Sequence, residues 1–358
     1  MKRSYIAKNR LISQRIVGPK FAHPRDVVSW LGAVQAQDYS MAKWALGLRL
    51  KTATETSVEA AIDSGAIIRT HVLRPTWHFV AAEDVRWMLE LTSPRIQQAC
   101  SFRQRFLELD NKTLSRCNDL IAGALEGGNN LTRQELMIVL ERAGISTGIE
   151  RATHIMLQAE LDRVACNGKR RGKQFTYALF DEKVPQARSL PREEALANLA
   201  ERYFTSHGPA TLKDFVWWSG LTVADATSAL ITIGSRLHNE KIDGDTYWMG
   251  DLAMRSLAFT RSVRLLPAYD EFTVSYKDRT ASVAPELLKD VTVGHAIFRP
   301  IVVVDGRVVG IWKRSLDKNA TRIDYTFFEE LAPSRFAQLK KAAADYAKFE
   351  GKAVVNHR

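Results

Sequence analysis

WLGAVQAQDYSMAKWALGLR, residues 30–49, carries a polar segment between two apolar stretches. Apolar residues repeat at helical spacing on both sides of that segment: Val27, Val28, Leu31 and Val34 before it, and Met41, Trp44, Ala45 and Leu48 after it. We therefore expect one helix to run to about Val34 and a second to begin near Met41. Gln35, Gln37 and Asp38 lie between them, and buried amides require hydrogen-bond partners. This cluster predicts either a buried polar network or a functional site.

The surrounding residues 7–80 have the element order of a winged helix, a variant of helix-turn-helix. Alternating apolar and polar residues predict two paired strands at 67–72 and 77–80, and we expect His71 and His78 to face one another across them. Helices are expected before the strands, at 9–17, from about Arg25 into the opening stretch, at 41–50, and in a short segment that Ser57 caps and Gly65 ends.

Two later stretches repeat this order of helices followed by a hairpin. After mostly helical residues 82–126, Thr132 and Glu135 form the pattern of a capping box, which predicts helices at 133–143 and 149–162 and a hairpin at 163–179. Further helices are expected at 192–206, 212–218 and 223–236, and Asp243-Gly244 is a strong signal for a hairpin turn. The repetition predicts three tandem winged helices, each self-standing rather than part of a solenoid.

From Arg261 the sequence changes to the alternation typical of strands. Strands are expected at 263–267, on both sides of an Asp305-Gly306 turn within 301–314, and at 321–328, followed by a helix at 334–349. The predicted fold class is therefore α+β, with three tandem winged-helix domains followed by a small β-rich domain and a helical tail. The predicted domains are 1–81, 82–185, 186–256 and 257–358.

Basic residues outnumber acidic ones, 51 against 40, and the formal net charge is +11. Such a charge favours a polyanionic partner such as nucleic acid, or an anionic membrane surface. Because no apolar run approaches the length of a membrane span and the first residues lack a signal-peptide core, we expect no membrane association and a cytoplasmic, nucleoid-associated protein. Cys100, Cys117 and Cys166 lack CxxC spacing and are expected to be free thiols.

The strongest local concentration of positive charge lies at the tip of the second predicted hairpin. Lys169, Arg170, Arg171 and Lys173 supply four cations in five positions, and Gly172 favours a turn there. A basic hairpin tip after a helix pair is suited to contacting DNA phosphates, and a loop charged only for solubility is the alternative. The histidines and cysteines show no metal-ligand spacing, so no metal is expected.

Several segments, in their order and spacing, resemble the AlkZ-type winged-helix DNA glycosylases, a family that includes the YcaQ proteins. The matching segments are 35–38 (QAQD), 69–78 (RTHVLRPTWH), 82–84 (AED), 265–270 (LLPAYD) and 305–312 (DGRVVGIW). The resemblance covers nearly the whole chain and implies tandem winged helices that end in a β-barrel. It also implies excision of alkylated, chiefly N7-substituted purines from double-stranded DNA, unhooking of interstrand crosslinks by some members, and no cofactor.

The resemblance assigns the catalytic motif to Gln35 and Gln37, in the two-glutamine form. A site without a carboxylic acid is chemically reasonable, because an N7-alkylated purine already carries a positive charge and leaves as a neutral base without protonation. The two side-chain carbonyls can then orient a water beneath C1′ of the sugar. Asp38 is a candidate for supplying negative potential near the sugar cation. Without the resemblance, a structural role for both amides would be the better interpretation.

Three further residues of the matching segments are candidates for the site. Arg69 and Arg74 are expected to contact the DNA backbone, with plain surface charge as the alternative. His78 is expected either to contact a phosphate or the lesion, or to be a structural histidine.

Two other functions compete with a glycosylase that uses water and acts as a monomer. A winged-helix transcriptional regulator would bind an operator without catalysis, usually as a symmetric dimer. A family member that binds DNA but has lost catalysis is the second alternative, and the intact Gln35 and Gln37 pair argues against it.

Overall fold

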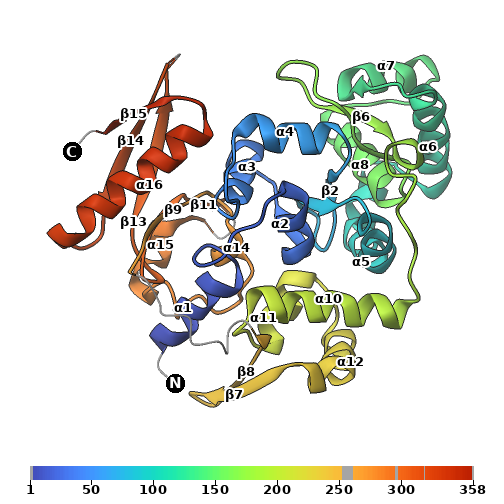
Figure 1. Cartoon of the computed structure of the whole chain (residues 1–358). Helices are drawn as coiled ribbons and strands as arrows, with labels where there is room; N and C mark the ends of the chain where they lie inside the picture. The colour runs from blue at the N-terminus through green and yellow to red at the C-terminus, as the bar shows by residue number, and fades with distance from the viewer. Residues whose placement is uncertain (1–2, 252–260, 295–296, 318, 357–358) are drawn as a thin grey trace. The chain divides into compact units, whose positions relative to one another are not determined.

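The computed structural model describes residues 3–251, 261–294, 297–317 and 319–356 (Figure 1). The chain divides into two compact units. The first comprises residues 1–59, 197–218 and 222–358, and the second comprises 60–196 and 219–221. The four predicted domains remain a prediction, and the predicted boundary between residues 256 and 257 lies outside the described residues.

The second unit combines helices with two small antiparallel sheets. The strands β2 (Ile67–His71) and β3 (Trp77–Ala81) pair antiparallel, as predicted. Their register places Thr70 opposite His78 and His71 opposite Trp77, so the expected pairing of the two histidines is wrong. The remaining elements are α5 (Val85–Phe106), α6 (Asn111–Leu125), β4 (Leu131–Thr132), α7 (Arg133–Arg142), α8 (Ile149–Leu161), β5 (Ala165–Asn167), β6 (Thr176–Leu179) and α9 (Phe180–Lys183), with strands in the order β4-β6-β5.

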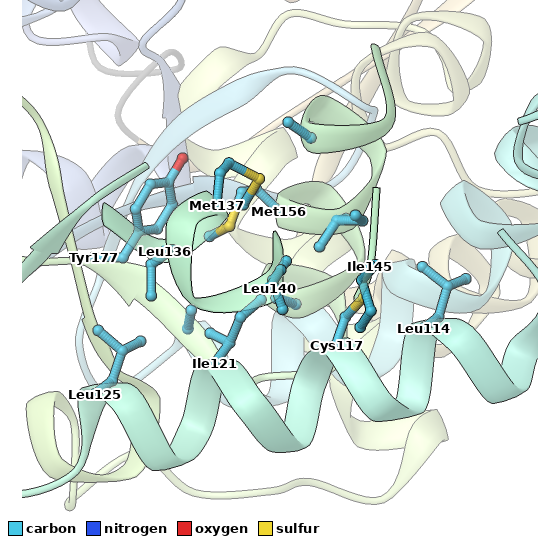
Figure 2. Close-up of a cluster of buried hydrophobic side chains, with 14 of the residues drawn as sticks. Leu114, Cys117, Ile121, Leu125, Leu136, Met137, Leu140, Ile145, Met156 and Tyr177 are labelled. Carbon is cyan, nitrogen blue, oxygen red and sulfur yellow. The ribbon is translucent and has the colours of Figure 1, made fainter. Parts of the chain in front are cut away.

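A hydrophobic cluster between α6, α7 and α8 forms a core of this unit (Figure 2). Ile121 and Leu125 of α6 and Leu136 and Leu140 of α7 are fully buried in it. The predicted capping box at Thr132 is confirmed: its hydroxyl accepts from the Glu135 N–H, while the Glu135 carboxylate accepts from the Thr132 N–H. This cap fixes where α7 begins and so aims the apolar face of α7 at α6.

The first unit begins with α1 (Arg3–Ser13), α2 (Pro24–Leu31), β1 (Ala33–Gln35) and α3 (Tyr39–Gly47), and α4 (Glu55–Asp63) spans the boundary of the units. Two expectations are corrected here. The helix expected at 9–17 ends at Ser13, and α2 stops at Leu31 because Gly32 has a φ of +81°, so Val34 lies on a strand. Thr54, rather than Ser57, accepts the N–H that caps α4.

The middle part of the first unit contains the third set of helices and hairpin. These elements are α10 (Arg192–His207, which begins in the second unit), α11 (Leu212–Ser219), α12 (Val223–Ile233), η1 (Gly234–Arg236), β7 (His238–Ile242) and β8 (Asp245–Met249). The predicted turn is confirmed, since β7 pairs with β8 and Asp243 and Gly244 have φ values of +50° and +89°. A bridge between Ala210 and Trp248 replaces the short first strand of the other sets.

The last part of the unit is built on one five-stranded sheet. Its order is β15-β14-β13-β12-β9, formed by β9 (Val263–Leu266), β12 (Ile301–Val304), β13 (Arg307–Leu316), β14 (Ala320–Phe327) and β15 (Ala353–Asn356). Among the described residues this order is that of an open sheet, which does not confirm the barrel. β15 pairs with β14 in parallel, because α16 (Phe336–Phe349) carries the chain back between them. Short elements complete it: α14 (Glu271–Val274), η2 (Pro285–Leu287), α15 (Leu288–Val291), β10 (Thr292–Val293), β11 (Ile297–Phe298) and η3 (Pro333–Arg335).

Candidate functional site

The two candidate catalytic amides lie at the end of β1 and just after it. Gln35 is the last residue of β1 and is 8% exposed, whereas Gln37 is exposed in the connection before α3. Asp38 is the N-cap of α3, and its Oδ1 accepts the Met41 N–H at 3.0 Å. The expectation that these amides follow the end of a helix is therefore wrong. They occupy a strand end and the short irregular segment that follows it.

A buried carboxylate contacts the main chain of this motif. Glu271, the first residue of α14, is 1% exposed, and its Oε1 accepts the Gln35 N–H at 2.7 Å. Its Oε2 accepts from Trp218 Nε1 at 3.1 Å and from the Ser275 hydroxyl. The ring of His207 lies beside the same oxygen, with Nε2 at 3.6 Å.

This network sets the charge of Glu271. Burial alone would raise the pKa of Glu271, but His207, the Ser275 hydroxyl and the Gln35 N–H together lower it to about 2. Burial lowers the pKa of His207, more than Glu271 raises it, and His207 Nδ1 lies 2.8 Å from the Ser206 hydroxyl. We conclude that Glu271 is an anion at neutral pH and that its neighbours His207, Ser275 and Gln35 favour that charge.

The residue before Glu271 is fixed by a second buried network. Asp270 accepts two hydrogen bonds from Arg49, both at 2.9 Å, and neither side chain is exposed. Arg49 also donates to the main-chain and side-chain oxygens of Gln14, at 2.9 and 3.0 Å. The hydrogen bonds of Asp270 and Glu271 therefore both hold the start of α14 in place.

Tyr269, directly before this pair, contributes an aromatic side chain close to Asp38. Burial raises the pKa of Tyr269, and the negative charge of Asp38 adds to the effect. Its φ is +60°, a conformation rare for a bulky residue and one that tends to occur at functional sites.

In the second unit, two residues expected at the DNA interface are largely buried. Arg69 is 8% exposed, and its guanidinium lies over Trp77 at 4.0 Å and Phe175 at 4.8 Å. His78 is 0% exposed, and its Nδ1 lies 2.9 Å from the Thr76 carbonyl oxygen. This burial favours structural roles for both side chains. Arg74, in the turn between β2 and β3, is half-buried.

The basic hairpin forms as predicted between β5 and β6. Lys169, Arg171 and Lys173 are exposed, and Gly172 turns the tip with a φ of +62°. Arg171 is paired with Glu135 at 2.8 Å and also donates to the Asn130 carbonyl, which restrains it. Arg170 is half-buried, with its guanidinium 5.3 Å from the Phe175 ring centre. Lys169 and Lys173 have no ion pair among the described residues, so their charges face solvent.

The part of the chain that the structure describes contains no cluster of His, Cys, Asp and Glu that could hold a metal ion. Within the same residues, no helix is long and apolar enough to span a membrane. Cys100, Cys117 and Cys166 are free, as predicted.

Sequence reasoning missed Glu271, His207 and Tyr269. The signal available was a pair of adjacent carboxylates inside the apolar run LLPAYDEFTV, residues 265–274, since charges seldom occupy such a run without partners.

Comparison with known proteins identifies the chain's relatives. A family model described as "DNA glycosylase AlkZ-like" matches residues 28–349. The chain belongs to the AlkZ-like DNA glycosylase family. A relative described as the interstrand DNA cross-link repair glycosylase of Streptomyces sahachiroi is 26% identical over 321 residues, which cover 82% of this chain and 84% of the relative. The solved structure of Streptomyces sahachiroi DNA glycosylase AlkZ matches with a TM-score of 0.82 and 23% identity, covering 99% of each chain.

The family assignment confirms the resemblance seen in the sequence and classes this AlkZ-like protein as a DNA-repair hydrolase acting on the N-glycosidic bond. It thereby favours an enzyme over a transcriptional regulator. The structural match confirms the mixed helix and sheet fold over the full chain.

Proposed function

We propose that this AlkZ-like protein hydrolyses the N-glycosidic bond of alkylated, N7-substituted purines in double-stranded DNA, with a water positioned by Gln35 and Gln37. The observation that carries the proposal is the placement of these amides. Gln35 ends a strand and is fixed through its main chain to Glu271, and Gln37 follows two residues later on an exposed segment. Two side-chain carbonyls in this arrangement are suited to accept both hydrogens of one water.

The chemistry fits a cationic leaving group. A neutral purine leaves readily only when a proton donor assists it, a role that a carboxylic acid fills in ordinary glycosidases. Glu271 cannot serve as that acid, because it stays ionised at neutral pH and both its oxygens accept hydrogen bonds from protein groups. An N7-alkylated purine needs no such proton, so water positioning and stabilisation of the sugar cation suffice. Asp38, whose Oδ1 caps α3, is proposed to add negative potential near that cation.

We propose that DNA binding uses the three repeated helix and hairpin sets as winged helices, followed by a domain of the barrel type. The second set supports this best, since α6, β4, α7, α8, β5 and β6 follow the winged-helix order. Within its wing, Lys169 and Lys173 are the strongest candidates for phosphate contacts, and Arg170, Arg171 and Arg74 are secondary ones. We propose structural roles in this region for Arg69 and His78, because both side chains are buried. A single chain that carries all these elements is proposed to act as a monomer.

Crosslinks are proposed as additional substrates. The Streptomyces sahachiroi relative is named an interstrand DNA cross-link repair glycosylase, and this chain spans 84% of its length. A crosslink joined through N7 of guanine has the same cationic leaving group as a simple N7 adduct, so the chemistry above applies to both.

A comparison of cationic and neutral lesions tests the proposal. Duplexes containing either 7-methylguanine or the neutral 8-oxoguanine would be incubated with excess enzyme, and released base would be quantified. We expect release of 7-methylguanine only, leaving an abasic site. Equal release of the neutral lesion would refute the proposal, because that product requires a proton donor in the site.

A further inference from the structure

We infer that Glu271 is a positioning residue that fixes the main chain of Gln35 for the hydrolytic step. The inference rests on the proposed function of Gln35, and it adds a residue that lies outside the glutamine motif. Glu271 is 236 positions away in sequence and meets the motif only through the fold.

The hydrogen bonds of Glu271 leave its carboxylate little freedom to turn. One oxygen accepts the Gln35 N–H at 2.7 Å, and the other accepts from the Trp218 indole and the Ser275 hydroxyl. Trp218 is itself 0% exposed, so its ring cannot move away without disturbing the core of the first unit. Glu271 therefore links a rigid part of the core to the strand end that carries the catalytic amide.

The bond to Gln35 is placed where the chain most needs restraint. β1 ends at Gln35, and regular structure resumes only at Tyr39, where α3 begins. A charge-assisted hydrogen bond at the last strand residue fixes the direction in which the following segment leaves. Because a misplacement of about 1 Å can slow a reaction about 100-fold, this restraint is directly relevant to a water positioned by Gln35 and Gln37.

The charge of Glu271 strengthens its restraint on Gln35. A hydrogen bond to an ionised carboxylate is roughly twice as strong as one to a neutral acceptor, so the charge holds the Gln35 N–H more firmly. The carboxylate is 1% exposed, so water screens it little.

The test is Glu271→Gln, compared with Asp214→Asn as a matched control. Glutamine preserves shape but removes the charge, and its single acceptor oxygen cannot serve all three donors. Asp214 is also 1% exposed and lies in the same unit. It accepts from the main-chain N–H groups of Thr211, Lys277 and Asp278 and lies 3.6 Å from the buried guanidinium of Arg10, but it has no bond to Gln35. Asp214→Asn therefore reports the general cost of neutralising a buried carboxylate.

Two measurements are made on the full chain at a temperature where all variants are folded. In single-turnover release of 7-methylguanine at saturating enzyme, Glu271→Gln should be slower than wild type by about 10-fold or more. The DNA affinity of Glu271→Gln should stay within about twofold of wild type. The release rate and the DNA affinity of Asp214→Asn should also stay within about twofold of wild type. In amide hydrogen exchange, the Gln35 N–H should exchange faster in Glu271→Gln and at the wild-type rate in Asp214→Asn.

A double variant identifies the route of the effect. If Glu271 acts through Gln35, Gln35→Ala combined with Glu271→Gln should be no slower than Gln35→Ala alone. Wild-type release by Glu271→Gln, equal slowing by Asp214→Asn, or fully additive slowing in the double variant would each overturn the inference.

The two hypotheses fail in different ways. Wild-type release by Gln35→Ala itself would overturn the proposed role of Gln35, whatever the result for Glu271. If wild type releases no base at all, the proposed function fails, and Gln35 exchange still decides whether Glu271 fixes its main chain. Unchanged exchange in Glu271→Gln would then overturn the inference as well.

Discussion

Replacing Arg49 by methionine should strongly destabilise the first unit. All five guanidinium N–H donors of Arg49 are used: two bond to Asp270, two to Gln14 and one to the Ala45 carbonyl, at 2.7 to 3.0 Å. Methionine fills a similar volume but removes every donor. Asp270 then remains buried as an uncompensated charge next to Glu271.

Removal of one partner from a buried ion pair costs about 3 to 5 kcal/mol, and we expect a loss of that size for Arg49→Met. Arg49→Met combined with Asp270→Asn removes both charges, so its loss should be smaller than the sum of the single losses. The free energies would be measured by urea denaturation followed by tryptophan fluorescence. Arg103→Met, which breaks the exposed pair with Glu150, is the control and should change stability far less. A loss below about 1 kcal/mol for Arg49→Met would refute the assignment of Arg49 as the main support of Asp270.

Three further predictions address acid stability, DNA binding and the core of the second unit. Because folding lowers the pKa of Glu271 from 4.5 to about 2, its contribution to the free energy of unfolding is complete above pH 4.5 and is lost as the pH falls toward 2. Glu271→Gln should flatten the pH dependence of that free energy in this range, by on the order of 3 kcal/mol. An unchanged pH profile would contradict the pKa assignment. Lys169→Ala combined with Lys173→Ala should weaken DNA binding and reduce the slope of log K against log salt by about 2. Arg171→Ala should change this slope less, because the Arg171 guanidinium is already paired with Glu135. A wild-type slope in the double lysine variant would remove the hairpin tip from the interface. Ile121→Ala should cost about 2 to 5 kcal/mol in the unfolding transition of the second unit, and a loss below about 1 kcal/mol would show that α6 packs less tightly than its buried side chains indicate.

Local signals in the sequence predicted much of the fold correctly. The Thr132 capping box, the Asp243-Gly244 turn and the β2–β3 hairpin all depend on residues a few positions apart, and all three form as expected. Errors occurred where one residue overrides a periodic pattern. Val34 continues a helical repeat, but the positive φ of Gly32 ends α2 and places Val34 on a strand.

The candidate site was predictable only in part. The resemblance found Gln35 and Gln37. The capping role of Asp38 was not predicted, because the helix after it was expected to begin near Met41 rather than at Tyr39. The contact between Glu271 and Gln35 was not predictable, because it depends on long-range packing that no local pattern specifies. Arg69 and His78 show the opposite limit: their residue types favour DNA contact, but packing buries both side chains.

The most direct test of the central claim is single-turnover release of 7-methylguanine from alkylated duplex DNA, with wild type and Gln37→Ala compared at saturating enzyme. Gln37 is exposed, so its replacement should leave folding and DNA affinity nearly unchanged. We predict release by wild type and a rate lower by about 100-fold or more for Gln37→Ala, because the lost amide acts on the attacking water. Equal rates for the two proteins would contradict the assignment of the hydrolytic site to the glutamine motif.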